Sequence, residues 1–90
     1  MSDNKHYDNI TITADGYGLN HQIRKAVEEI GELLAELGRV MCGADNLGAV
    51  IEETADTYNM LDQLCYLFEI ENEVQEIAEK KMQRAASKFR

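Results

Sequence analysis

Apolar residues recur every three or four positions through the middle of the chain, and this spacing predicts a helix from about Asn20 to about Met41. At about 100° per residue, six apolar side chains fall within roughly 80° of one another around the predicted axis. They are Ile23, Val27, Ile30, Leu34, Leu37 and Met41. Gly43 follows this apolar stripe and ends the helix.

The same spacing predicts two more helices. One runs from Leu47 to about Ile70, and the other begins after a break near Glu71. The second predicted helix carries Val50, Thr57, Leu61, Leu64 and Phe68 on one face, and the third carries Val74, Ile77, Ala78, Ala85 and Phe89. We therefore expect an all-α fold of three main helices. Because 90 residues bury only a limited core, we expect homo-oligomerisation to complete the bundle.

Residues 1–18 read differently from the rest of the chain. The β-branched run "ITIT" favours a short extended segment, and "ADGYG" is a turn signal with two glycines. The sequence thus predicts a short irregular N-terminal arm over residues 1–18, followed by one helical domain over residues 19–90.

The charge balance changes the picture of possible partners. The formal net charge is −8, and a strongly acidic surface repels nucleic acid and anionic lipid. Between residues 28 and 79 there are fourteen acidic residues and a single basic one, Arg39. Water, the basic C-terminus or a bound cation must neutralise these carboxylates.

The location is predicted from the absence of targeting signals. No apolar run has the length of a signal peptide or of a membrane span. The two cysteines, Cys42 and Cys65, lack a CxxC spacing and are expected to be reduced thiols in a cytoplasmic protein.

Two pairs of carboxylates stand out on the predicted helix faces. Glu53 falls inside the apolar arc of the second helix, with Asp56 three residues later at its edge. Glu29 and Glu32 repeat this spacing beside the apolar stripe of the first helix. Acidic runs on helices are commonly solvated faces, but a carboxylate within an apolar arc is hard to solvate. If the pairs converge, a cation must hold them together, and all-oxygen ligands suit Mg²⁺ or Mn²⁺.

One basic residue also lies on an apolar face. Lys81 falls inside the apolar arc of the third helix, with Arg84 on the adjoining side. The lysine stem can pack against the helix while its ammonium reaches water. Alternatively, the cation reaches the carboxylates or a bound phosphate.

These motifs give the chain a family resemblance. "EEIGELLAEL" followed by "IEETADTYNMLDQL" resembles the MazG-like members of the all-α nucleoside triphosphate pyrophosphohydrolases, whose pattern is EExxE, a spacer, then ExxD. The pattern is met by Glu28, Glu29 and Glu32, then by Glu53 and Asp56, with 20 residues between Glu32 and Glu53. The likeness extends over roughly residues 17 to 84, as in small stand-alone, phage-type members.

The resemblance implies an activity and a set of ligands. Such proteins hydrolyse nucleoside triphosphates to the monophosphate and pyrophosphate with Mg²⁺, as helical dimers or tetramers. By motif position, the metal ligands would be Glu29, Glu32, Glu53 and Asp56. Glu28 would be an outer carboxylate, and the catalytic carboxylates would come from Glu28, Glu29 and Glu32.

It also implies substrate contacts. Lys81 and Arg84 would contact phosphates, by their place in the last helix. His21 and Gln22 lie one to two turns before the acidic motif, where the base would be met.

Two alternatives stay open. One is an enzyme: phosphoribosyl-ATP pyrophosphohydrolase shares the fold and the use of clustered carboxylates. A non-catalytic acidic helical module that dimerises or binds a basic protein would need no metal at all.

Overall fold

The computed structural model of the chain describes residues 4–90, and this part is helical without a strand. The helices are α1 (Asn4–Tyr17), α2 (Leu19–Met41), α3 (Leu47–Leu67) and α4 (Glu71–Ala86), and a 3₁₀ turn, Ser87–Phe89, follows α4. The all-α prediction is confirmed, and the bounds predicted for α2 and α3 agree to within a few residues.

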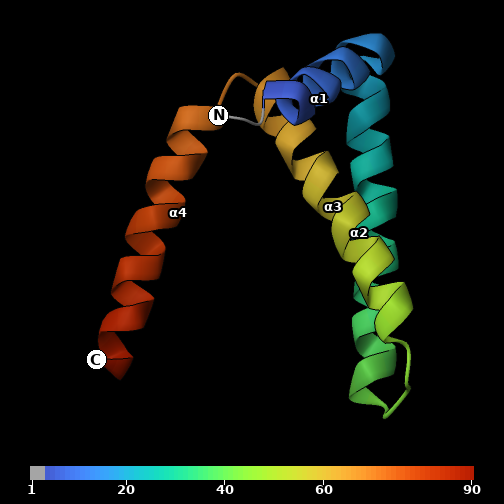
Figure 1. Cartoon of the computed structure of the whole chain (residues 1–90), viewed down its shortest axis with the longest axis vertical. Coiled ribbons are helices and arrows are strands. Elements are labelled where there is room, and N and C mark those ends of the chain that lie inside the picture. The colour runs from blue at the N-terminus through green and yellow to red at the C-terminus, as the bar shows by residue number, and fades with distance from the viewer. Residues whose placement is uncertain (1–3) are drawn as a thin grey trace.

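The long helices α2 and α3 form an antiparallel hairpin (Figure 1). Gly43 ends α2 in the left-handed region at φ 88°, with its N–H donating to the Val40 carbonyl at 2.9 Å. The Asn46 amide then donates to the Glu36 carbonyl at 3.1 Å and to Glu36 Oε1 at 2.7 Å. These bonds tie the short loop to α2, so the two helices pack side by side.

The prediction of an irregular N-terminal arm and of three helices was wrong for the described residues, because residues 4–17 form a fourth helix, α1; residues 1–3 of the predicted arm lie outside the described residues. The β-branched residues of "ITIT" disfavour a helix only weakly, and tertiary packing overrides that preference. Ile10 and Ala14, one helical turn apart, are buried, and Ala14 is completely inaccessible. Tyr66 on α3 also donates a hydrogen bond to Asp15 Oδ2 at 2.7 Å.

A single glycine allows α1 to fold back over the hairpin. Gly18 separates α1 from α2 and has φ 87°, a region that residues with a Cβ rarely adopt. Figure 1 shows α1 lying across the end of the hairpin where α2 begins and α3 ends. The sharp turn brings the last residues of α1 close to the first turns of α2.

The contact between α2 and α3 is unusually polar. The buried residues of α2 are Gln22, Ala26 and Glu29, and those of α3 are Thr57, Met60 and Gln63. The apolar stripe predicted on the first long helix lies elsewhere: each of its six residues is exposed. Among the described residues, the buried apolar side chains are Ile10, Ala14, Ala26 and Met60, a very small core.

The last helix leaves the hairpin. Glu69, at φ 58°, turns the chain after α3, and α4 diverges from the other helices (Figure 1). Tyr7 on α1 donates a hydrogen bond to Glu71 Oε1 at 3.1 Å at this corner, yet no residue of α4 is buried. Within residues 4–90, none of the helices combines the length and the apolar character needed to cross a bilayer.

Candidate functional site

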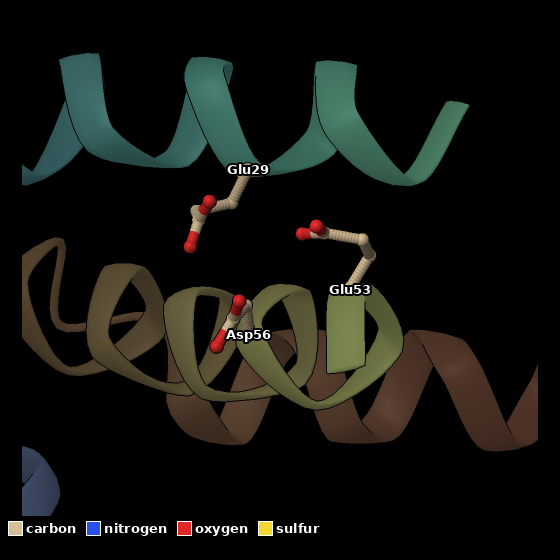
Figure 2. Close-up of side chains that lie close together, drawn as sticks. All are labelled: Glu29, Glu53 and Asp56. Carbon is tan, nitrogen blue, oxygen red and sulfur yellow. The ribbon is translucent and has the colours of Figure 1, made fainter. Parts of the chain in front are cut away.

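Three of the predicted carboxylates meet between the long helices. Glu29 projects from α2 toward Glu53 and Asp56 on α3 (Figure 2), and one oxygen of each lies within 4.8 Å of the others. The i, i+3 spacing places the two α3 side chains on one face of their helix, while the antiparallel packing brings Glu29 opposite them. We refer to Glu29, Glu53 and Asp56 as the acidic cluster.

The cluster runs from a buried to an open end. Glu29 is 8% exposed, Glu53 is half-buried and Asp56 is exposed. Glu53 Oε1 is buried and has no hydrogen-bond partner in the described part of the chain. A buried carboxylate oxygen without a donor is costly unless a proton or a cation neutralises the carboxylate.

The crowding of acids perturbs their protonation. A hydrogen bond with Glu32, followed by burial and the charge of Asp56, raises the pKa of Glu29 to about 7. Burial is the main cause that raises the pKa of Glu53, with further contributions from the charges of Glu32, Asp56 and Glu36. Both carboxyl groups therefore hold a proton more tightly than they would in water.

The cluster fits a divalent cation. Its donors are all carboxylate oxygens from two helices, which is the donor type preferred by Mg²⁺ and Mn²⁺. Bound metal would neutralise the mutual repulsion and give Glu53 Oε1 the partner it lacks. Asp56 leaves one side of the cluster open to solvent.

The other two acids of the motif are placed differently. Glu32 is exposed and lies outside the cluster, although it hydrogen-bonds Glu29. Glu28 is also exposed and forms an ion pair with Lys25, whose Nζ lies 3.6 Å from Glu28 Oε1. Of the four predicted metal ligands, the structure brings three together and leaves Glu32 beside them.

A cavity of about 530 Å³ opens next to the acidic cluster and is bounded by α1, α2 and α3. Glu29, Asp56 and the predicted base contacts His21 and Gln22 all line it. Sequence reasoning missed five of its other polar or aromatic lining residues: Thr13, Tyr17, Lys25, Asn59 and Gln63. Thr13 and Tyr17 could not be found because they belong to the unpredicted α1. Gln63 could have been found, because it is a polar amide that lies one helical turn from the apolar Met60.

A chain of hydrogen-bonded amides that lines this cavity determines the tautomer of His21. Gln63 donates from Nε2 to the Asn59 carbonyl at 3.3 Å, so its Oε1 is the acceptor for Gln22 Nε2 at 2.6 Å. Gln22 Oε1 then faces His21 Nδ1 at 2.7 Å. Because a backbone carbonyl can only accept, the direction of the chain is set, and neutral His21 carries its proton on Nδ1. Its Nε2 is left as an acceptor without a partner among the described residues.

Tyr17 holds the imidazole ring in place. The rings of Tyr17 and His21 are stacked, with centroids 4.5 Å apart and planes 13° from parallel. Gln22, which completes the arrangement, is 2% exposed.

The predicted phosphate contacts lie elsewhere in the chain. Lys81 and Arg84 are exposed on α4, which diverges from the hairpin that carries the acidic cluster (Figure 1). A single chain therefore does not bring these two cations to its own carboxylates.

Comparison with protein-family models, with curated proteins and with solved structures finds no match to this chain.

Proposed function

We propose that the chain is a metal-dependent nucleoside triphosphate pyrophosphohydrolase of the MazG-like type, which converts a (d)NTP and water to the (d)NMP and pyrophosphate. The observation that carries the proposal is the acidic cluster, with the orphaned Glu53 Oε1, at the edge of a cavity large enough for a nucleobase. A triphosphate is repelled by a chain of net charge −8 unless metal ions mediate the contact.

Glu29, Glu53 and Asp56 would hold Mg²⁺, with Mn²⁺ as a substitute and Glu32 as a further ligand. The bound ion supplies charge neutralisation and Lewis acidity toward the phosphate. Glu32 and Glu28 stand exposed on the adjoining turn of α2, where a carboxylate can accept a proton from an attacking water. Lys25, which pairs with Glu28 and lines the cavity, would offset the negative charge of the leaving pyrophosphate.

The base of the nucleotide would occupy the cavity beside the cluster. The amide chain of Gln63 and Gln22 presents His21 Nε2 as a hydrogen-bond acceptor, so the base would meet it with an N–H group. Stacking of Tyr17 keeps that acceptor fixed in orientation. Gln22 thus acts by positioning His21, because its own amide is engaged on both sides.

We further propose that the protein is a cytoplasmic homodimer or homotetramer. Free Cys42 and Cys65 suit a reducing compartment. In such an assembly, Lys81 and Arg84 would contact the phosphates bound at the acidic cluster of a neighbouring copy, since α4 leads away from its own.

The test is pyrophosphate release from a panel of canonical and modified (d)NTPs, and from phosphoribosyl-ATP, with Mg²⁺. We expect wild-type activity on at least one nucleoside triphosphate and its near-complete loss in Glu53→Gln. Glu52→Gln is the matched control, because Glu52 is the exposed neighbour of Glu53 in the chain and lies outside the cluster. No release by the wild-type protein, or full activity of Glu53→Gln, refutes the proposal, and activity on phosphoribosyl-ATP alone reassigns the substrate.

A second measurement separates an enzyme from an acidic interaction module. Millimolar Mg²⁺ should raise the melting temperature of the wild-type protein, since a ligand that binds only the folded state stabilises it. The shift should persist in Glu52→Gln and vanish in Glu53→Gln. Melting that is insensitive to Mg²⁺ and Mn²⁺ would favour the module.

A further inference from the structure

A single hydrogen bond from Thr57 joins the two halves of the acidic cluster. Thr57 lies on α3 directly after Asp56, is buried, and donates from Oγ1 to the main-chain carbonyl of Glu29 on α2 at 3.4 Å. Threonine inside a helix commonly donates back to a carbonyl three or four residues earlier in its own helix. This hydroxyl instead bonds across the interface, to the main chain of the residue that carries the buried carboxylate of the cluster.

Polar contacts, more than apolar packing, set the register of α2 against α3. The buried apolar residues of these helices are Ala26, which is small, and Met60, which is flexible, so they specify the register only weakly. Near the end of the hairpin that α1 crosses, Gln22 Nε2 donates to Gln63 Oε1 at 2.6 Å. Two helices held at that point alone can still pivot. The Thr57 bond lies two helical turns farther along, beside the acidic cluster, and opposes the pivoting.

The acidic cluster and this hydrogen bond are both wider than a bound ion requires. The carboxylate oxygens lie within 4.8 Å of one another, whereas neighbouring ligands of Mg²⁺ stand about 3 Å apart. The Thr57 bond of 3.4 Å likewise exceeds the usual O–H···O distance of about 2.7 Å. The same small approach of α2 toward α3 therefore closes the cluster around an ion and shortens the bond.

A bond that shortens when the cluster closes contributes to the affinity for the ion as well as to stability. A ligand shifts an equilibrium between two arrangements only by interacting differently with each of them. Because the Thr57 bond is stronger in the closed arrangement, part of its free energy appears in ion binding. Removing a hydrogen-bonding group that orients a metal ligand typically weakens metal binding by about 10- to 100-fold.

We infer that Thr57 is a positioning residue for a divalent ion: its hydroxyl holds the main chain of Glu29 where the carboxylates of the acidic cluster can share one small cation. The inference rests on the metal site of the proposed function and adds the residue that decides which ion fits there. Mg²⁺ requires short distances and nearly octahedral geometry, whereas Ca²⁺ accepts longer and less regular ones. The Thr57 bond thus favours Mg²⁺ over Ca²⁺.

Ion binding to the nucleotide-free protein, measured by titration calorimetry, tests the inference without any hydrolysis. Thr57→Val keeps the shape of the side chain and removes the donor, while the Glu29 carbonyl keeps its partner within α2. We expect Kd for Mg²⁺ to rise about 10-fold, Kd for Ca²⁺ to rise less, and Thr57→Ser to restore the wild-type values. Thr54→Val is the matched control, because Thr54 is exposed on α3 and lines a groove that contains no residue of the cluster.

A double-mutant cycle separates positioning from a general loss of stability. If Thr57 acts through Glu29, Thr57→Val should weaken Mg²⁺ binding about 10-fold in the wild-type background and hardly at all in Glu29→Gln, whose amide has already lost the charge of that ligand. Equal losses in the two backgrounds, an unchanged ratio of the Mg²⁺ and Ca²⁺ affinities, or the same loss in Thr54→Val overturns the inference.

The result for Thr57 can be told apart from the result for hydrolysis. Mg²⁺ binding that depends on Thr57, in a protein that releases no pyrophosphate, supports the inference and refutes the proposed reaction. Pyrophosphate release with an unchanged Mg²⁺ affinity in Thr57→Val overturns the inference alone. A wild-type chain that binds neither ion overturns both.

Discussion

Glu29 is the residue of the acidic cluster whose surroundings perturb it most. It is the one buried member of the acidic cluster, and its pKa is raised from 4.5 to about 7 by Glu32, by burial and by Asp56. The folded state therefore holds a proton that the unfolded state releases above about pH 4.5. Stability contributed by this proton is present at low pH and is lost as the pH rises toward about 7.

The corresponding prediction concerns the metal-free protein. In the presence of a chelator, its melting temperature should fall as the pH is raised from about 5 to about 7.5. Glu53, whose pKa is also raised, acts in the same direction. Glu29→Gln should flatten the profile, because the amide cannot ionise, whereas Glu28→Gln should leave its slope in place. A wild-type melting temperature that rises over this interval contradicts the description of the cluster.

His21 gives a prediction about binding rather than chemistry. His21→Phe keeps a ring that can stack on Tyr17 but removes the Nε2 acceptor. We expect KM for the preferred nucleotide to rise about 2- to 10-fold with kcat nearly unchanged, as for one lost hydrogen bond. His6→Phe, which lines a separate groove on α1 and α3, is the control. A fall in kcat at constant KM would show that His21 does not bind the base.

The sequence predicted this site in part, for a physical reason that can be stated. Helical spacing places Glu53 and Asp56 on one face, so their pairing follows from local geometry. That Glu29 rather than Glu32 enters the cluster depends on how α2 is rotated against α3, which is a tertiary property. The amide chain was equally beyond local reasoning, because Gln22 and Gln63 are 41 residues apart.

At the scale of the elements, the helix periods identified α2, α3 and α4, while α1 was missed. The long apolar patterns of α2, α3 and α4 are strong local signals. In α1 the signal is short, because Ile10 and Ala14 carry most of its burial and β-branched threonines surround them. The helix is stabilised from outside, by packing and by the Tyr66–Asp15 hydrogen bond.

The turn that positions α1 gives the next prediction. Gly18→Ala should destabilise the protein by about 1–3 kcal/mol, because alanine must adopt φ near 87° there. Gly16→Ala, two residues away inside α1, should be neutral or stabilising, since a Cβ meets nothing within 4 Å and its φ is ordinary. Denaturant unfolding of the two variants measures the contrast. Equal effects would mean that the turn does not constrain α1.

At the scale of the whole molecule, the chain is assembled with its polar residues between the long helices and its apolar stripe outside. The position of α4 extends this arrangement, since Val74, Ile77 and Met82 are 42%, 52% and 65% exposed. The proposed association of copies would cover these exposed apolar side chains. The sequence predicted association from length alone, but it could not say which face of α2 would be left uncovered.

The separation of α4 from the cluster leads to a mixing experiment. If Lys81 and Arg84 serve the site of a neighbouring copy, two inactive variants should complement each other. Glu53→Gln mixed with Lys81→Ala/Arg84→Ala should regain part of the wild-type activity after exchange of subunits, because one cluster in the mixed assembly is then complete. Each variant incubated alone is the control. Inactivity of the mixture after the subunits have exchanged would contradict a site shared between copies, and full activity of the double variant would remove both cations from the site.

The scarcity of buried apolar side chains within one chain also bears on temperature. Unfolding a lone chain exposes less new surface than unfolding a compact chain of its size, so its heat-capacity change should fall below the usual value of about 12–15 cal/mol/K per residue. The apolar contribution to its stability, which weakens on cooling, is correspondingly reduced. We therefore expect the stability of a lone chain to change less steeply with temperature than that of a compact domain of the same length.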